Sequence, residues 1–222
     1  TRDAAAASAA YHSLAKVLAE RLGRSEDAIA ALGEARKLSP PESPLLLLIL
    51  GELARLQEQQ QRWEAAAEAL RARNEALNAS PNGDPQERIA NKLRLAELCD
   101  EKLRNGSEAV AWYRAVIAHA PGHPAALAAL GRLHARAGNW EGVLETFLAE
   151  VAAATDNREK AQKSFKAASL LEERLGRLPE AIDRYLDALQ LHPGFLPAQK
   201  ALERIYEKAG RWADLVKLLE RE

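Results

Sequence analysis

The pattern of hydrophobic and polar positions in the last part of the chain repeats the pattern in the part before it. The two parts match when Glu180 is aligned with Glu108. Glu108-Ala109-Val110 then aligns with Glu180-Ala181-Ile182, and Tyr113 aligns with Tyr185. Further matches pair Pro121-Gly122 with Pro193-Gly194, Leu130 with Leu202, and Ala137-Gly138-Asn139-Trp140 with Ala209-Gly210-Arg211-Trp212. Agreement of proline, glycine and tryptophan over this length is typical of a repeat architecture. We call this alignment the long repeat.

Each block of the long repeat divides into two smaller units, which we expect to be helix–turn–helix hairpins. Small or apolar residues open the second helices at Ala28, Ala66, Ala109, Val143, Ala181 and Leu215. The shortest interval between them is roughly 34 residues, a length typical of helical repeats. Such residues let two antiparallel helices approach closely. We expect units over residues 9–40, 44–80, 85–121, 122–155, 157–193 and 194–222, forming one continuous array over residues 1–222.

Glycines and prolines mark the expected turns. Gly23, Gly138, Gly176 and Gly210 stand where a first helix must end with a left-handed residue. Pro40, Pro121 and Pro193 stop the second helices, because proline cannot continue the backbone ladder. The segment 79–85 is the strongest loop signal, so we expect an irregularity there.

These motifs resemble the tetratricopeptide repeat family, whose period is about 34 residues. Leu130-Gly131, Leu133-His134 and Ala137-Gly138-Asn139-Trp140 are similar to the first helix and turn of that repeat, and Ala181, Tyr185, Ala188 and Pro193 to its second helix and exit. Gly23-Arg24, Ala28, Ala35 and Pro40 repeat the exit pattern. The resemblance covers nearly the whole chain and implies an all-α, right-handed α-solenoid of about six repeats that acts as an interaction scaffold.

The composition supports a helical protein and argues against nucleic acid and membranes as its partners. Hydrophobic residues make up 47%, aromatic residues 5% and charged residues 28%, and the net charge is −1. This balance gives no general drive towards nucleic acid or an anionic membrane surface. The longest aliphatic run, Leu45 to Leu50, is far shorter than the roughly 20 residues that cross a bilayer as a helix, so we expect no membrane insertion.

The ends of the chain and its single cysteine suggest what kind of protein the chain comes from and in which compartment it is found. The chain starts at Thr1, contains no Met and stops inside a helical pattern at Glu222, so we interpret it as a fragment of a longer protein. The repeat sequence also resembles the long repeat arrays found in proteins of GC-rich bacteria. No secretory signal opens the chain and a lone Cys99 fits a reducing compartment, so we expect a cytoplasmic protein.

Few residues offer chemistry, and we predict no catalysis, cofactor or metal site. The five histidines lack the converging spacing that zinc requires, and Pro121-Gly122 separates His119 from His123. Cys99 lies on an apolar stripe, where a buried thiol is inert. Carboxylate pairs such as Glu172-Glu173 are expected on exposed helix faces. We expect Trp63, Trp140 and Trp212 to pack between helices, and Trp112 to contact a partner or an adjacent repeat.

The resemblance implies that first helices line a concave side where partners dock. Basic residues recur there at matching positions of the long repeat, and the predicted binding residues are Arg94, Lys102, Arg132, Arg136, Lys163, Lys166, Arg174, Lys200, Arg204 and Lys208. With apolar contact from Leu98 and Leu170, they predict a groove for an acidic segment of another protein. The alternative is that these charges only solvate a helix face.

Two further functions stay open at this point. A basic stripe is compatible with RNA binding, although the neutral net charge and the absence of aromatics among the basic lining residues count against it. Self-assembly is the other, because the open end at Lys217-Leu218-Leu219 offers a surface for stacking another copy.

Overall fold

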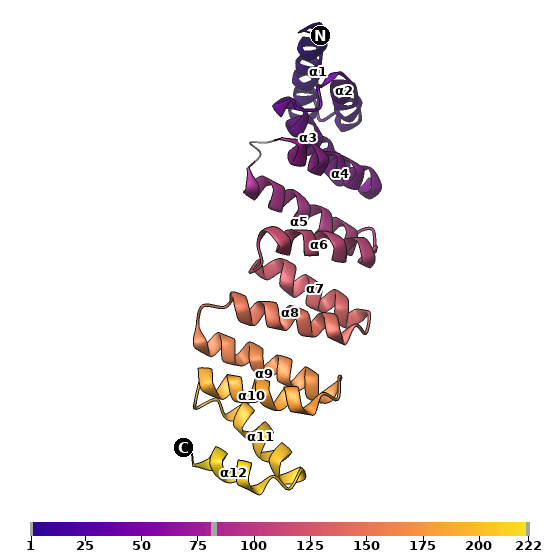
Figure 1. Cartoon of the computed structure of the whole chain (residues 1–222). Coiled ribbons are helices and arrows are strands. Elements are labelled where there is room, and N and C mark those ends of the chain that lie inside the picture. Colours follow the sequence, from indigo (N-terminus) through magenta and orange to yellow (C-terminus); the bar gives the residue numbers. More distant parts are fainter. Residues whose placement is uncertain (1, 81–83, 221–222) are drawn as a thin grey trace. The chain divides into compact units, whose positions relative to one another are not determined.

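The computed structural model describes residues 2–80 and 84–220, and these residues form twelve α-helices. Each first helix and the second helix that follows it lie antiparallel as a hairpin (Figure 1). The six hairpins are α1 (Arg2–Glu20) with α2 (Ser25–Leu38), α3 (Pro44–Gln59) with α4 (Trp63–Ala79), α5 (Pro85–Glu101) with α6 (Gly106–His119), α7 (Pro124–Arg136) with α8 (Trp140–Ala153), α9 (Asn157–Glu173) with α10 (Leu178–Leu191), and α11 (Leu196–Lys208) with α12 (Trp212–Leu219). The predicted all-α repeat fold is confirmed, and the first hairpin begins before the expected residue 9.

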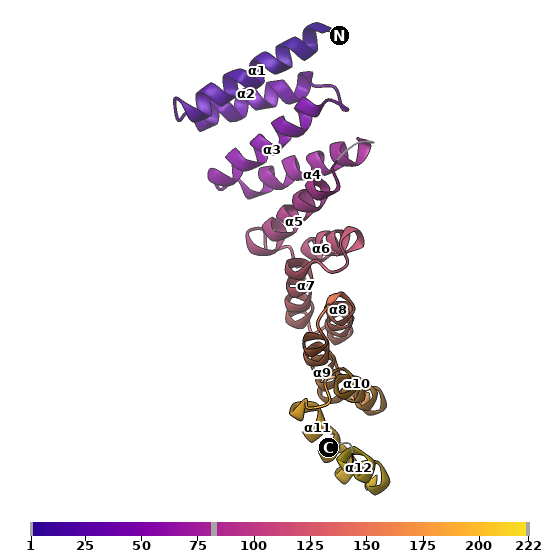
Figure 2. The ribbon, with the colours of Figure 1, turned by 90° about the vertical axis from the view of Figure 1, so that its left-hand side faces the viewer.

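Contacts divide the chain into two compact units, Thr1–His119 and Ala120–Glu222, called unit 1 and unit 2 below. Unit 1 contains α1 to α6, and unit 2 contains α7 to α12. Within each unit, a second helix packs against the first helix that follows it, as α2 does on α3 and α8 does on α9 (Figure 2). A single continuous array over residues 1–222 stays a prediction.

Five of the six residues predicted at the helix crossings are buried, and the sixth, Leu215, is partly buried. Ala28, Ala66, Ala109 and Ala181 have no exposed surface, and Val143 is 5% exposed. An alanine at a crossing allows the helix axes to come close, so that larger side chains interdigitate on either side. In unit 2, Tyr185, Leu171 and Leu202 fill this space in one apolar core.

The turn inside every hairpin uses a residue with positive φ. The four predicted glycines adopt this conformation, with φ between 64° and 68°. The other two hairpins, both in unit 1, use Gln61 (φ 57°) and Arg104 (φ 54°) at the equivalent place. Residues other than glycine rarely adopt this conformation because Cβ approaches the following carbonyl oxygen, so neither position could be recognised as a turn by its residue type.

The prolines end the second helices as expected, since α2, α6 and α10 each stop two residues before Pro40, Pro121 and Pro193. The irregularity expected over residues 79–85 falls partly on residues 81–83, which lie outside the described residues. On either side of them, α4 ends at Ala79, and Asp84 caps α5 by accepting a hydrogen bond from the Gln86 amide at 2.9 Å.

The tryptophans at the start of second helices differ in their surroundings. Trp63 and Trp140 are partly buried, in agreement with a packing role, whereas Trp212 is 62% exposed. Trp112 is partly buried, and its indole N–H donates to the Glu108 carboxylate of the same helix at 3.2 Å. The packing prediction therefore fails for Trp212, which no other helix covers in the part of the chain that the structure describes.

Candidate protein-binding surface

The predicted binding residues are divided between the two units. Arg94 and Lys102 lie on α5 or at its end in unit 1. The other eight lie on α7, α9 and α11 of unit 2 or at their ends: Arg132, Arg136, Lys163, Lys166, Arg174, Lys200, Arg204 and Lys208. Most of the predicted basic surface therefore belongs to unit 2.

In unit 1 both predicted cations already have partners. The Arg94 guanidinium donates two hydrogen bonds to the Glu58 carboxylate, each 2.9 Å long, and so joins α5 to α3. The Lys102 ammonium lies 5.1 Å from the centre of the Trp63 ring. These residues line a small cavity of about 150 Å³ together with Glu97, Leu98 and Glu101. Because three carboxylates accompany two cations there, this part of the face has little charge left for an acidic ligand.

Three of the predicted cations in unit 2 are also engaged. The Lys163 ammonium forms an ion pair with Glu150 at 2.7 Å, and Arg204 forms one with Glu172 at 2.7 Å. The Arg174 guanidinium lies 4.9 Å from the centre of the Trp140 ring. These contacts join neighbouring hairpins, so the three side chains stabilise the stack.

Glu172 is a residue whose role the sequence analysis missed. Its side chain is only 15% exposed, so the expectation that Glu172-Glu173 lies on an exposed face is wrong for Glu172, although Glu173 is exposed. Its carboxylate accepts a hydrogen bond of 3.0 Å from the Tyr185 hydroxyl. Burial, together with the neighbouring Glu172 carboxylate, raises the pKa of Tyr185 to about 12.

Four predicted cations of unit 2 remain exposed: Arg132 on α7, Lys166 on α9, and Lys200 and Lys208 on α11. None of the four forms an ion pair or hydrogen bond among the described residues. Arg136 is also exposed but has an interaction of its own. We call these four residues the open cations.

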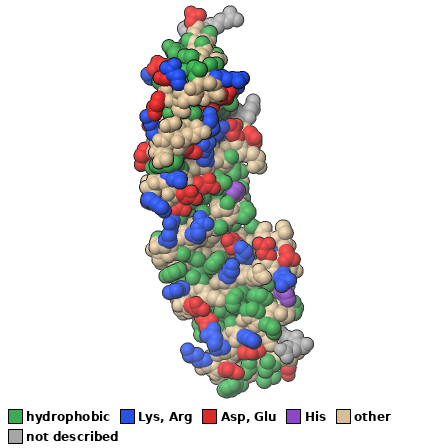
Figure 3. Space-filling view, turned by 180° about the vertical axis from the view of Figure 1, so that it is seen from behind, with side chains coloured by type: hydrophobic (Ala, Val, Ile, Leu, Met, Phe, Trp, Pro, Cys, Tyr) green, Lys and Arg blue, Asp and Glu red, His purple; other side chains and the backbone are tan. Residues whose placement is uncertain are grey.

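The predicted apolar contacts are not available at this surface. Leu98 is 6% exposed and Leu170 is 9% exposed, so both pack beneath the charged layer. On the face of the molecule shown in Figure 3, charges of both signs are interspersed with hydrophobic side chains. Since Leu98 and Leu170 are buried, the predicted binding at this surface depends on its charged side chains.

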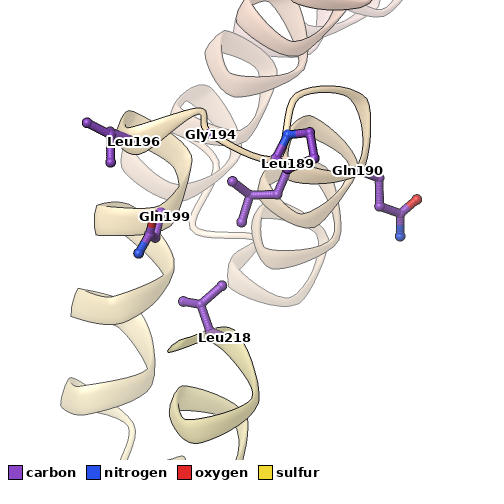
Figure 4. Close-up of a pocket in the computed structure, with 7 residues that line it drawn as sticks. Leu189, Gln190, Gly194, Leu196, Gln199 and Leu218 are labelled. Atoms are coloured by element: carbon purple, nitrogen blue, oxygen red, sulfur yellow. The ribbon is translucent and has the colours of Figure 1, made fainter. Parts of the chain in front are cut away.

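A larger cavity of about 540 Å³ lies among α10, α11 and α12 in unit 2. Leu189, Leu218 and Gln199 line it, whereas the Gln190 side chain points away (Figure 4). Gly194 at its edge corresponds to Gly122 in the long repeat.

The hairpin of α7 and α8 shows what fills the equivalent space. A Cβ atom placed on Gly122 would lie 3.0 Å from Ala153, in the last turn of the 14-residue α8. The corresponding helix α12 has 8 residues. The 540 Å³ cavity thus corresponds to a place that α8 fills in the preceding hairpin.

Other chemistry is limited. The described residues contain no group of three or more His, Cys, Asp or Glu side chains placed to hold a metal ion. Burial, and next the Glu108 carboxylate, raise the pKa of the Cys99 thiol to about 11, so the thiol stays protonated at neutral pH. None of the described helices combines the length and apolarity needed to span a membrane.

Comparison with known proteins points to one repeat family. A tetratricopeptide repeat model matches residues 17–79 and 101–158, together more than half of the chain, and a second model of the same description matches residues 200–222. The comparison with curated proteins gives no match.

Several solved structures are similar to the chain at low identity. The chain is 18% identical to a tetratricopeptide repeat protein from Parabacteroides merdae, covering 97% of this chain and 78% of that one, with a TM-score of 0.51. It is 15% identical to YrrB, described as a TPR protein with an unusual peptide-binding site, covering 87% of this chain and 90% of that one, with a TM-score of 0.48. It is 14% identical to the TPR2AB domain of yeast Sti1 in a complex with pHSP90, covering 96% of this chain and 88% of that one, with a TM-score of 0.38.

Proposed function

Because this chain belongs to the tetratricopeptide repeat family, in general a non-catalytic protein-interaction fold, we propose that it is a scaffold that binds an acidic segment of a partner protein. The proposed site is the exposed face of α7, α9 and α11, through the open cations. One observation carries the proposal: Arg132, Lys166 and Lys200 stand on three successive first helices without a neighbouring carboxylate partner among the described residues.

The physical basis is electrostatic complementarity. An exposed ion pair stabilises by only about 0.2–1 kcal/mol, so several are needed for specific capture. Their field also speeds the encounter with an oppositely charged segment. Lys163, Arg174 and Arg204 belong to the same proposed surface, but each must exchange an internal contact for a ligand contact.

Titration with a fluorescent peptide rich in glutamate, read by anisotropy, tests the proposal. We expect binding that weakens steeply as salt is raised, since salt screens exposed charges. Reversing the three cations Arg132, Lys166 and Lys200 to Glu should abolish binding. The matched control reverses Lys16, Arg55 and Arg158, which are also exposed, and so changes the net charge equally.

Two results would contradict the proposal. If the control lowers affinity as much as the test variant, net charge and not this surface attracts the peptide. If the chain binds single-stranded RNA at low salt more tightly than the acidic peptide, the RNA alternative replaces it. Circular dichroism of each variant, with unchanged helicity expected, separates loss of binding from unfolding.

We also propose that copies of the chain associate through their end helices. The supporting observation is exposed apolar surface on α1, where Leu14 is 48% and Val17 is 51% exposed, and on α12, where Val216 is 52% exposed. The cytoplasmic location and the absence of catalysis in this particular chain stay predictions.

A further inference from the structure

The small cavity of unit 1, about 150 Å³ in volume, is lined by residues of α3 and α4 and of α5 with its C-terminal cap. Trp63, the first residue of α4, and Leu98 of α5 supply its apolar surface. Leu98 is 6% exposed and Trp63 is partly buried, so the surrounding helices hold both side chains in place. Pockets for small-molecule ligands are usually about 300–1,000 Å³, so this cavity has room for a single side chain of a partner rather than for a whole ligand.

Carboxylates outnumber cations around this cavity. The charged residues that line it are Glu58, Glu97, Glu101, Arg94 and Lys102. The Arg94 guanidinium and the Glu58 carboxylate neutralise each other through their two hydrogen bonds of 2.9 Å. The rest of the lining has two carboxylates and one ammonium group, so the cavity favours a positively charged group over a negatively charged one.

The Glu101 carboxylate is available to a ligand. Glu101 is exposed and forms no ion pair or hydrogen bond among the residues that the structure describes. Its neighbour Lys102 directs its ammonium to the Trp63 ring instead, 5.1 Å from the ring centre. Lys102 is itself exposed and has no ion pair within the described part of the chain, so only the ring holds its ammonium.

A tryptophan ring at this place in a hairpin accepts either kind of cationic side chain. Lys102 lies over Trp63, and in unit 2 the Arg174 guanidinium lies 4.9 Å from the centre of the Trp140 ring. The attraction between a cation and an aromatic ring is weak at an exposed site, so a ligand cation can replace Lys102. Arginine has an advantage over lysine as the ligand, because its planar guanidinium stacks on the ring while its N–H groups donate to a carboxylate.

The equivalent place in unit 2 has fewer carboxylates. Counted from the left-handed residue of each turn, Ala135 and Ser169 of unit 2 stand where unit 1 has Glu58 and Glu97. At the third position, Glu173 of unit 2 keeps the carboxylate. The acidic lining is therefore a property of the unit 1 cavity and not of every tryptophan–cation contact in the chain.

We propose that this cavity binds an arginine side chain of a partner protein. The guanidinium stacks on the Trp63 ring and donates hydrogen bonds to the Glu101 carboxylate, after the Lys102 ammonium has moved off the ring. Lys102 thus competes with the ligand from within the chain. This site goes beyond the proposed binding of an acidic segment, since it lies in unit 1 and does not use the open cations.

Nuclear magnetic resonance of the indole N–H groups of the 4 tryptophans tests the proposal on the full chain. The probe is a capped pentapeptide, Gly-Ser-Arg-Ser-Gly, and its control is the same peptide with glutamine in place of arginine. We expect the arginine peptide to shift the Trp63 signal, which is identified by its loss in Trp63→Phe, with a dissociation constant of about 1 mM. The Trp140 signal should not move, because fewer carboxylates surround that ring.

Two substitutions test the parts of the site. Lys102→Gln should strengthen binding of the arginine peptide about threefold, because it frees the Trp63 ring. Its matched control is Lys16→Gln, which removes the same charge from an exposed position of α1 and should leave the affinity unchanged. Glu101→Gln should weaken binding about threefold, and Glu20→Gln, which neutralises an exposed carboxylate of α1, is its control.

Each contrary outcome has a separate meaning. An unmoved Trp63 signal, or an equal shift with the glutamine peptide, would overturn the site as a whole. Equal gains for Lys102→Gln and Lys16→Gln would show that net charge, and not release of the ring, attracts the peptide. A lysine peptide that binds as tightly as the arginine peptide would overturn the choice of arginine. The glutamate-rich peptide should bind equally to Glu101→Gln and Glu20→Gln, which keeps this test independent of the open cations.

Discussion

Arg94 of unit 1 and Lys166 of unit 2 stand at matching positions of α5 and α9 in the long repeat, yet they have different roles. Arg94 is held by two hydrogen bonds to Glu58 on the preceding first helix, whereas Lys166 is exposed without an ion pair among the described residues. Unit 1 therefore uses this position to join its hairpins, and unit 2 leaves it open to solvent. A repeated basic pattern in a sequence does not by itself distinguish a structural cation from one that is available for binding.

Unit 1 has other charged contacts between helices, and removing the largely buried Arg73 should have the largest effect. The Arg73 side chain is 18% exposed, donates to the Leu47 carbonyl at 3.1 Å and to Asn91 Oδ1 at 3.3 Å, and forms an ion pair with Glu87. Arg73→Ala leaves these acceptors unsatisfied, and we expect a loss of about 3 kcal/mol in unfolding free energy. Urea denaturation followed by tryptophan fluorescence measures it.

The control for this change is Arg184→Ala in unit 2. Arg184 pairs with Asp187 on an exposed helix surface, so its removal should alter stability by less than about 0.5 kcal/mol. Equal losses for the two variants would show that the arginines of unit 1 are no more structural than surface ones.

Alkaline pH should destabilise the two units over different pH ranges, because a different buried group loses its proton in each. The pKa of Cys99 in unit 1 is raised from its usual 9.0 to about 11, and that of Tyr185 in unit 2 from 10.0 to about 12. In each case the folded state keeps its proton longer than the unfolded state, so stability is full below the usual pKa and is lost as pH rises through the shifted one. Each group accounts for a loss of up to about 2–3 kcal/mol.

Hydrogen exchange resolved by peptide follows this loss in each unit. We expect protection of α5 to decline between pH 9 and 11 and protection of α10 between pH 10 and 12. Cys99→Ala should remove the first decline and leave the second. A decline in α5 that persists in Cys99→Ala would refute the assignment to the thiol.

Alanine substitutions of Arg94 and Lys166 should change the unfolding free energy less than the changes described above. Arg94→Ala should cost about 1 kcal/mol, because it removes a two-bond ion pair between α3 and α5. Lys166→Ala should change stability by less than about 0.5 kcal/mol and weaken binding of the acidic peptide. If Lys166→Ala destabilises as much as Arg94→Ala, Lys166 is a structural residue and the open-cation assignment fails for it.

The smallest expected effect concerns the turns of unit 1. Gln61 and Arg104 hold a left-handed conformation that glycine adopts without a steric cost. Gln61→Gly and Arg104→Gly should each stabilise the chain by about 0.5–1 kcal/mol, while Gly176→Ala in unit 2 should destabilise it by about 1 kcal/mol. Thermal unfolding by circular dichroism is sufficient for this series, and a lower melting temperature for Gln61→Gly would contradict it.

The hairpins were predictable from sequence because their signals are local. Ala181 at a helix crossing, Gly138 in a turn and Pro193 at a helix exit each report a constraint set by a few neighbouring residues. The left-handed turns at Gln61 and Arg104 carry no such signal, since the fold imposes that conformation on ordinary side chains.

Which of the predicted basic residues are open to solvent could be predicted only in part from the sequence, because their contacts depend on the adjacent hairpin. Arg94 and Glu58 are 36 residues apart and Arg204 and Glu172 are 32 apart, so sequence spacing alone does not show that they meet. Leu98 and Leu170 were expected to contact a ligand, but they lie on the side of their helices that faces the core. A face assigned from helical periodicity is accurate to about one position, and one position separates surface from core here.

The chain of contacts from Arg204 through Glu172 to the Tyr185 hydroxyl connects the solvent-facing layer of unit 2 to its interior. If an acidic ligand binds to this surface as proposed and draws the Arg204 guanidinium away from Glu172, it would change the charge near the buried Tyr185 phenol. The near-ultraviolet absorption of Tyr185 is sensitive to that charge. Unit 2 thus contains an intrinsic chromophore whose spectrum would report occupancy of the proposed surface without any attached label.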